Sequence, residues 1–304
     1  MSAHVAILMG GWSAEREVSL VTGAAISAAL KVRGYRVTEV DADRNLAAVL
    51  TDVKPDVVFN ALHGRWGEDG CVQGLLEILG LPYTHSGVRA SALAMDKPVA
   101  KRIFKEAGLR VADDAVVASA QLFDAEPLPR PFVVKPSNEG SSVGVAIIKE
   151  GDNFAPDQPG PWQTFDEVMV ETYVPGREVT SAVMGDRVLG VLELQPTRGF
   201  YDYEAKYTEG VTDHVMPAPI HADAYEEARE SALAAHRALG CRGVTRADFR
   251  YDDRDGEPGR LYLLETNTQP GMTPLSLVPE IAAHEGISFE DLAVWMVEDA
   301  SCPR

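Results

Sequence analysis

The feature that most constrains the fold is a change of pattern near residue 95. Before that point, strand-like and helix-like runs alternate along the chain, at 4–9, 16–33, 35–42, 56–62 and 70–79. Such alternation with short loops predicts a parallel sheet covered by helices, with ligands approaching the loops that follow the strands. Two of these loops, GGWSAERE at 10–17 and HGRWGEDG at 63–70, are rich in polar and charged residues.

Beyond residue 95 the pattern becomes that of an antiparallel sheet. A helical run at 96–108 opens with a proline near its start, as helix N-termini tolerate. Strand-like segments with few helices between them follow at 131–135, 144–148, 168–174, 178–184 and 187–194, and a long helix is expected at 222–239. The whole chain is therefore expected to be α/β, with a parallel first part and an α+β remainder.

The charge balance limits the classes of partner. The chain has 304 residues, of which 28 are basic and 46 acidic, giving a net charge of −18. This charge disfavours nucleic acid and anionic membrane surfaces as partners, so an anionic ligand would need lysines, backbone N–H groups and a divalent cation placed locally. The apolar runs are far shorter than the roughly 20 residues of a membrane span. With three scattered cysteines and no CxxC, the chain is expected in the reducing cytoplasm.

The segment 243–267 predicts a hairpin with a metal site. Period-two alternation places Arg246 and Asp248 on one face of its first run, and Glu265 and Asn267 on one face of its second. The turn signal DDRDGEPG predicts that Asp248 lies opposite Glu265 and Arg246 opposite Asn267. Two carboxylates and an amide oxygen suit Mg²⁺ better than zinc. The alternative is a set of ordinary polar positions on a half-exposed sheet.

The stretch KPSNEGSSVG at 135–144 predicts a phosphate-binding loop. Its lysine precedes the glycines, and the loop joins two strand-like runs, so it is not a P-loop. Glycines nevertheless let backbone N–H groups approach phosphate oxygens, serines add donors, and Lys135 adds positive charge. An ordinary flexible hairpin is the alternative. The magnesium site predicted on the later hairpin at 243–267 favours the phosphate interpretation.

Ordered blocks along the whole chain then suggest a family: MGGWSAEREVSL at 9–20, NALHGRWGEDGCVQGLLE at 60–77, MDKPVAK at 95–101, KPSNEGSSVGV at 135–145, YDYEAKY at 201–207, RADF at 246–249 and LLETNTQPGMTPLSLVP at 263–279. Together they resemble the ATP-grasp superfamily and, within it, the D-alanine–D-alanine ligases. The resemblance implies a substrate-binding α/β domain at 1–95 and two ATP-grasp subdomains at 96–178 and 179–304. It also implies ATP as co-substrate, two Mg²⁺ or Mn²⁺ ions and a homodimer.

The resemblance implies the following nucleotide and metal roles. Lys97 and Lys135 would contact the phosphates, beneath a loop at 136–144 that contributes Glu139, Ser141 and Ser142. The adenine would be lined by Glu171, Thr172, Tyr173 and Val174, and the ribose hydroxyls held by Glu178. The two magnesium ions would be held by Asp248, Glu265 and Asn267, with Glu265 bridging them.

The family reaction phosphorylates one D-alanine carboxylate, and the amine of a second D-alanine attacks the acyl phosphate, as in peptidoglycan precursor synthesis. By resemblance, Glu15 would bind the first ammonium, and Arg246 with the Gly271 N–H would stabilise charge at the reacting carbonyl. Ser276 and the Leu277 N–H would hold the second carboxylate. His63 and Lys206 would lie near the reacting centre, and Tyr207 and Ser141 would link to Glu15 under a closing lid.

Several alternatives stay open. Taken singly, Glu15 could be a helix first-turn carboxylate, His63 a loop histidine bonded to backbone, and Lys97 a solvated helix lysine. The pair Lys206-Tyr207 resembles the dipeptide-forming enzymes, which favours D-alanine over D-lactate or D-serine as second substrate. An ATP-grasp enzyme with another substrate and a non-catalytic nucleotide sensor are the rival functions. A dinucleotide-binding domain is disfavoured because GGWSAE is not GxGxxG.

Overall fold

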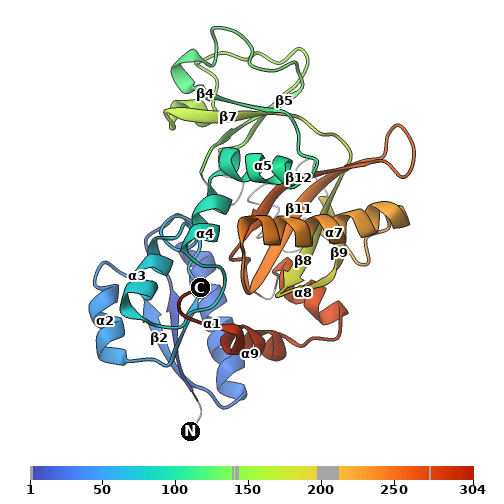
Figure 1. Ribbon diagram of the computed structural model, residues 1–304. Coiled ribbons are helices and arrows are strands. Elements are labelled where there is room, and N and C mark those ends of the chain that lie inside the picture. Colours follow the sequence, from blue (N-terminus) through green and yellow to red (C-terminus); the bar gives the residue numbers. More distant parts are fainter. Residues whose placement is uncertain (1–2, 139, 141–143, 197–211, 274) are drawn as a thin grey trace.

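The N-terminal part is a parallel α/β unit, as expected. The computed structural model describes residues 3–138, 140, 144–196, 212–273 and 275–304 (Figure 1). Its first sheet has the order β2-β1-β3 with parallel pairing, from β1 (His4–Met9), β2 (Arg36–Asp41) and β3 (Val57–Asn60). The helices of this part are α1 (Arg16–Val32), α2 (Leu46–Val53), α3 (Cys71–Leu79) and α4 (Val88–Met95). The carboxyl ends of β1 and β3 therefore lie at one edge of the sheet, where their polar loops meet.

A four-stranded antiparallel sheet follows the helix α5 (Lys97–Glu106). Its order is β4-β7-β5-β6, from β4 (Asp114–Ala118), β5 (Phe132–Pro136), β6 (Ala146–Ile148) and β7 (Glu167–Thr172). Two short 3₁₀ turns, η1 (Ser119–Gln121) and η2 (Pro161–Gln163), accompany it. In Figure 1 this sheet lies at the top of the view, above α5 and α4. The predicted phosphate loop is the connection between β5 and β6, which pair as a hairpin.

The later antiparallel strands form a second sheet rather than continuing the first. This five-stranded sheet has the order β10-β9-β8-β11-β12, from β8 (Arg177–Met184), β9 (Arg187–Pro196), β10 (Thr212–Val215), β11 (Val244–Asp252) and β12 (Arg260–Asn267). Strand β7 ends at Thr172, and the chain then turns through Pro175 and Gly176 into β8. Gly176 has a φ of +98°, and a Cβ there would collide with the Tyr251 carbonyl, so glycine is needed where the chain changes sheet. The expected boundary after residue 178 falls inside β8.

One buried core joins the two ends of the chain. Helix α7 (Ala222–Leu239) packs on the five-stranded sheet, and the chain ends with α8 (Leu277–His284) and α9 (Phe289–Asp299). Helix α9 packs against α1, as Figure 1 shows. Ile7 and Ile26 share a buried apolar cluster with Val244, Ile281 and Met296. The division of the chain at residues 95 and 178 stays a prediction, because this core includes residues from the first and last parts.

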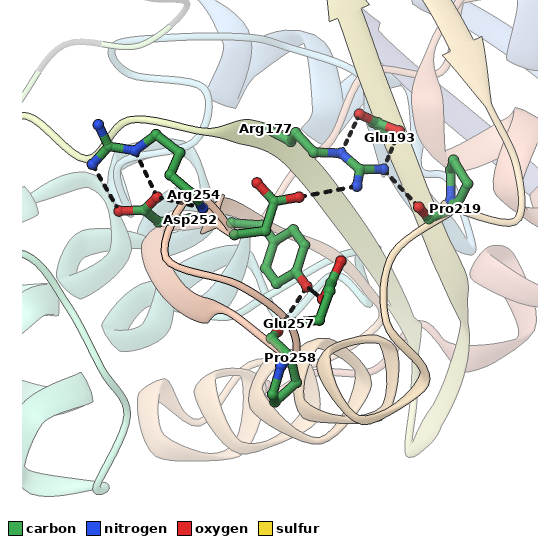
Figure 2. Close-up of polar contacts among 9 residues, drawn as sticks. Arg177, Glu193, Pro219, Asp252, Arg254, Glu257 and Pro258 are labelled. Atoms are coloured by element: carbon green, nitrogen blue, oxygen red, sulfur yellow. Dashed lines mark hydrogen bonds and ion pairs between the residues drawn. The ribbon is translucent and has the colours of Figure 1, made fainter.

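The turn between β11 and β12 is held by polar contacts beyond its backbone. Arg254 donates to the Asp252 carboxylate at 2.8 Å (Figure 2). The Tyr251 hydroxyl donates to the Pro258 carbonyl at 2.7 Å. Beside it, Arg177 on β8 donates to both Glu193 carboxylate oxygens at 2.8 Å, which ties β8 to β9. These contacts fix the far end of the hairpin that carries the predicted metal residues. None of the helices in the described ranges is long and apolar enough to cross a lipid bilayer.

Candidate active site

A cleft forms where the loops after β1 and β3 face the β11–β12 hairpin. It collects residues from segments that are far apart in the sequence, and nine of the predicted site residues line it: Glu15, His63, Lys97, Arg246, Glu265, Asn267, Gly271, Ser276 and Leu277. Gly140 of the predicted phosphate loop lines it as well. The cleft therefore brings together some residues of each predicted group, nucleotide, metal and substrate, whereas Asp248 and Lys135 are not among the residues that line it.

Glu15 lies at the meeting point of three loops. It is the N-cap residue of α1, with an 8% exposed side chain that makes no capping hydrogen bond to the helix. Gly64 has a φ of +69°, and a Cβ there would collide with the Glu15 carboxylate. A Cβ on Gly140 would lie 3.3 Å from Glu15 Oε2. The loop after β3 and the glycine-rich loop both pass close to this carboxylate, so Glu15 faces the cleft rather than serving the helix.

His63 and Glu68 flank Glu15 with groups that are neutral in this environment. The buried imidazole of His63 lies 3.1 Å from the Thr22 hydroxyl, and burial lowers the pKa of His63 to about 4. Glu68 lines the cleft and accepts a hydrogen bond from the Gly64 N–H at 2.5 Å. Burial and then the charge of Glu15 raise the pKa of Glu68 to about 8. This wall of the cleft thus has two neighbouring carboxyl groups, Glu15 and Glu68, which suit the binding of an ammonium group.

The hairpin has the predicted register. Asp248 pairs with Glu265 across the two strands, and Arg246 pairs with Asn267. The Arg246 guanidinium donates to both Asp248 oxygens, at 2.8 Å and 2.7 Å, and Thr180 donates to one of them at 2.7 Å. Residues two apart on a strand share a face, which explains the pairing of Arg246 with Asp248.

The donor set fits a hard divalent cation. Asp248, Glu265 and Asn267 offer two carboxylates and one amide oxygen on one face, and these are the ligands that Mg²⁺ prefers. Within the described residues, no group of three or more histidine, cysteine, aspartate or glutamate side chains is arranged to enclose a metal. A set of three such ligands leaves coordination positions for phosphate oxygens, which is how Mg²⁺ binds in nucleotide sites. A bound cation would compete with the Arg246 guanidinium for Asp248.

The predicted phosphate lysines lie on two different elements. Lys97 begins α5, with its ammonium 3.8 Å from Glu265 Oε2 and its backbone N–H donating to the Ser137 carbonyl at 2.9 Å. Lys135 on β5 donates to the Glu171 carboxylate at 2.6 Å. The Ser137 hydroxyl oxygen is buried, and no partner for it is found in the described part of the chain. A buried donor of this kind beside two lysines suits an anionic ligand.

The segment between β7 and β8 is organised by Arg250. The guanidinium donates to the carbonyls of Val174 at 3.0 Å and Gly176 at 2.6 Å, and it lies 3.5 Å from the Glu178 carboxylate. Tyr173 and Val174 line a hollow separate from the main cleft. The carboxylate of Glu171 is engaged by lysines. The adenine and ribose roles of this segment stay predictions.

The start of α8 forms a candidate carboxylate site. Ser276 is the N-cap residue of α8, and its hydroxyl accepts the Thr273 N–H at 2.9 Å. A Cβ on Gly271 would lie 2.8 Å from the Ser276 hydroxyl, so a side chain at position 271 would displace that hydroxyl. Helix N-termini present unpaired N–H groups, here including that of Leu277, to an anion. The predicted roles of Glu139, Ser141, Ser142, Lys206 and Tyr207 fall on residues outside the described ranges.

Two family models match along the chain. The model described as D-ala D-ala ligase C-terminus matches residues 103–298, which is more than half of the chain, and that described as D-ala D-ala ligase N-terminus matches residues 47–86. The chain belongs to the D-alanine–D-alanine ligase family. A curated family member named D-alanine–D-alanine ligase, from Parvibaculum lavamentivorans, is 60% identical over 304 residues, covering 99% of this chain and 98% of its own. Another with that name, from Paramagnetospirillum magneticum, is 58% identical over 310 residues, covering 99% and 100%.

Solved structures of the family have the same fold. The structure of D-alanine–D-alanine ligase from Bacillus anthracis matches with a TM-score of 0.85 and 31% identity, covering 98% of this chain and 97% of that one. The same enzyme complexed with ATP matches with a TM-score of 0.81 and 30% identity over the same shares. The α/β and ATP-grasp fold predicted from the sequence is confirmed.

Sequence reasoning missed three residues that organise this family member's cleft. Glu68 lies inside the quoted block at 60–77, and Lys101 ends the block at 95–101, yet neither was given a role. Gln269 accepts from the Asn60 amide at 2.9 Å and donates to the Leu62 carbonyl, which ties the end of β12 to the end of β3. Its backbone N–H also donates to Asn267 Oδ1 at 2.8 Å. For Glu68 and Gln269, which follow β3 and β12, the polar residues after each strand were the available signal, whereas Lys101 lies inside α5 and has no such signal.

Proposed function

We propose that this chain joins two D-alanine molecules in an ATP-dependent reaction that releases ADP and phosphate. Family membership supports this reaction, and the relatives carry the corresponding name. The observation that carries the proposal is the single cleft that combines Glu15, Arg246 and Ser276 with Lys97 and Glu265. It offers an acidic site for an ammonium, a guanidinium for developing negative charge, and a helix N-terminus for a carboxylate.

In the first step, a carboxylate oxygen of the first D-alanine attacks the γ-phosphorus of ATP, and ADP leaves. Glu15 would hold the ammonium of this D-alanine, with Glu68 beside it. The approach of an ammonium favours ionisation of Glu68, because the added positive charge offsets the repulsion from Glu15. Lys97 and Lys135 would orient the phosphates, and positioning supplies much of the rate enhancement in phosphoryl transfer.

In the second step, the amine of the second D-alanine attacks the acyl phosphate carbonyl, and inorganic phosphate leaves. The carbonyl oxygen gains negative charge, which Arg246 and the Gly271 N–H would stabilise. Ser276 and the N-terminus of α8 would hold the carboxylate of the incoming D-alanine. The neutral imidazole of His63 is suited to hydrogen bonding near the reacting groups without adding charge.

Three further features belong to the proposal. Asp248, Glu265 and Asn267 would hold Mg²⁺, which neutralises phosphate charge and polarises the transferred phosphoryl group when bound. If the hydrogen bonds between Arg246 and Asp248 broke, the Asp248 carboxylate could bind the cation and the Arg246 guanidinium could face the reacting carbonyl. A homodimer working in the cytoplasm, with D-alanine at both substrate sites and a role in peptidoglycan precursor synthesis, completes the proposal.

A coupled ADP-release assay tests this function. Purified protein is supplied with ATP and with D-alanine, L-alanine, D-serine or D-lactate, each with and without Mg²⁺. The expected result is ADP release that requires both D-alanine and Mg²⁺ and is accompanied by the dipeptide. ADP release that does not depend on D-alanine would contradict the proposal. A preference for D-lactate at neutral pH would show that D-alanine is not the second substrate.

A further inference from the structure

A fully buried lysine lies behind the proposed nucleotide site. Lys101 is on α5, one turn after Lys97, and its side chain is 1% exposed. Its ammonium donates to Glu171 Oε1 on β7 and lies 3.5 Å from Asp114 Oδ1 on β4. Lysine is almost never fully buried unless it is paired, so this position has a large desolvation cost that an exposed lysine would avoid.

The partner of Lys101 is also the partner of Lys135. Glu171 is 3% exposed, and its second oxygen accepts the Lys135 ammonium at 2.6 Å. One buried carboxylate thus faces two ammonium groups. Asp114 is engaged in addition by Lys105 at 2.9 Å, so it does not cancel the remaining charge by itself. The cluster of Lys101, Glu171 and Lys135 keeps a net positive charge.

We propose that Lys101 is a positioning residue that keeps the Lys135 ammonium available to the nucleotide phosphates by sharing the Glu171 carboxylate. The inference rests on the proposed function, in which Lys135 contacts those phosphates. If Lys101 were removed, the Glu171 carboxylate and the Lys135 ammonium would form a neutral ion pair in a buried environment. A neutral ion pair attracts a phosphate far less than does a Lys135 ammonium whose partner carboxylate is shared with a second lysine.

The electrostatics of the cluster agree with this sharing. Burial alone would raise the pKa of Glu171, but the charges of Lys135 and Lys101 outweigh it and hold the pKa below the usual value. Burial lowers the pKa of Lys101, and the charge of Glu171 opposes that effect. The carboxylate therefore stays ionised and depends on both lysines, so that removing one of them strengthens its hold on the other.

Replacement of Lys101 by methionine tests the inference against a matched control. Methionine has a similar length and no charge. Lys105 lies on the same helix and also pairs with Asp114, but its side chain is 47% exposed and has no contact with Glu171. In isothermal titration with Mg²⁺ and the ATP analogue AMP-PNP, Lys101→Met should weaken binding about tenfold, and Lys105→Met should change it by less than about twofold.

Two further variants separate positioning from a general loss of structure. Lys101→Arg keeps the shared charge and should retain most of the nucleotide affinity. Lys101→Met combined with Glu171→Gln removes the carboxylate that would capture Lys135. Because Glu171 also has a predicted role at the adenine, this double variant is measured with Mg²⁺ and tripolyphosphate, which has no adenine, and its affinity should recover relative to Lys101→Met alone. A merely structural lysine predicts no such recovery, because the double variant loses more contacts than the single one.

The outcomes distinguish this inference from the proposed function. Wild-type protein that fails to bind AMP-PNP, or to release ADP with D-alanine, would overturn the proposed function. Wild-type activity together with unchanged nucleotide affinity in folded Lys101→Met would overturn only the role of Lys101. A Lys101→Met variant that does not fold shifts the decision to the other two variants. Nucleotide affinity that falls in Lys101→Arg, or tripolyphosphate affinity that does not recover in a folded double variant, would then overturn the inference.

Discussion

The buried carboxyl group of Glu171 and the half-buried carboxyl group of Glu68 have surroundings that shift their pKa values in opposite directions. Glu171 lies between two lysines, which hold its pKa below the usual value despite burial. Glu68 faces Glu15 and Glu265, and burial together with those charges raises its pKa to about 8. Glu171 is therefore ionised behind the proposed nucleotide site, whereas Glu68 is mostly protonated beside the proposed ammonium site.

The contrast shows how an acidic chain can bind both an anion and a cation in one cleft. With a net charge of −18, the molecule as a whole repels polyphosphates, so positive charge has to be concentrated locally. Lys97, Lys101 and Lys135 provide that concentration on the side of the proposed nucleotide site. Glu15 lies on the other side, at the proposed ammonium site, and Glu68 beside it would ionise when an ammonium group approaches.

The largest expected effect follows from breaking the Glu171 cluster. Glu171→Leu leaves two lysines without their shared carboxylate, one of them fully buried, and should lower the free energy of unfolding by about 3–5 kcal/mol. The control is Glu227→Leu, which breaks an exposed pair with Arg110 at 3.0 Å and should cost no more than about 1 kcal/mol. Urea denaturation measures both. Equal losses would show that the buried cluster is no more important than a surface pair.

A smaller effect distinguishes the two carboxyls by pH. A raised pKa means that folded Glu68 keeps its proton while the unfolded chain releases it, so the contribution of Glu68 to stability is lost as pH rises toward 8. Glu68→Gln should therefore gain about 1–3 kcal/mol of unfolding free energy relative to wild type between pH 5 and pH 8. Glu171 has a lowered pKa, so its contribution is present above the unfolded pKa and is lost on acidification. A pH-independent difference for Glu68→Gln would show that its environment does not favour the proton.

The smallest expected effect concerns the helix that carries Lys97 and Lys101. Asp96 caps α5 by accepting the Val99 N–H at 3.0 Å, and Ser288 caps α9 by accepting the Asp291 N–H at 3.1 Å. Each replacement by alanine should cost about 1 kcal/mol of stability. Only Asp96→Ala should also raise the KM for ATP, by a few fold, because it loosens the helix next to the proposed phosphate site. An equal change in the KM for ATP in Asp96→Ala and Ser288→Ala would show that α5 is no more important for ATP binding than α9.

The sequence predicted the local elements and the hairpin better than the charge clusters. Alternation at 244–252 and 260–267 predicted which side chains share a face, and the turn signal predicted the pairing of Asp248 with Glu265, although the register shifts directly after Asp248. Alternation cannot tell whether successive antiparallel strands stay in one sheet, because this depends on a turn at 173–176 whose only local signal is Pro-Gly. The strand pattern alone therefore did not separate the two sheets, and only the family resemblance implied two subdomains, at 96–178 and 179–304.

The charge clusters depend on contacts between distant segments. Lys101, Glu171 and Lys135 come from α5, β7 and β5, and no local pattern reveals that they meet. Glu68 is part of a loop that was singled out for its polar content, but its protonation depends on Glu15 and Glu265 from two other segments. Roles that rest on residues outside the described ranges, such as Lys206 and Tyr207, stay predictions.

The division of charge across the cleft is tested most directly by crossed binding measurements. Isothermal titration would give the affinities of wild type, Lys101→Met and Glu68→Gln for D-alanine and, separately, for Mg²⁺ with AMP-PNP. Lys101→Met should weaken the nucleotide and leave D-alanine binding unchanged, whereas Glu68→Gln should weaken D-alanine and leave the nucleotide unchanged. If folded forms of both variants lost affinity for the same ligand, the two sides of the cleft would not have the separate roles described.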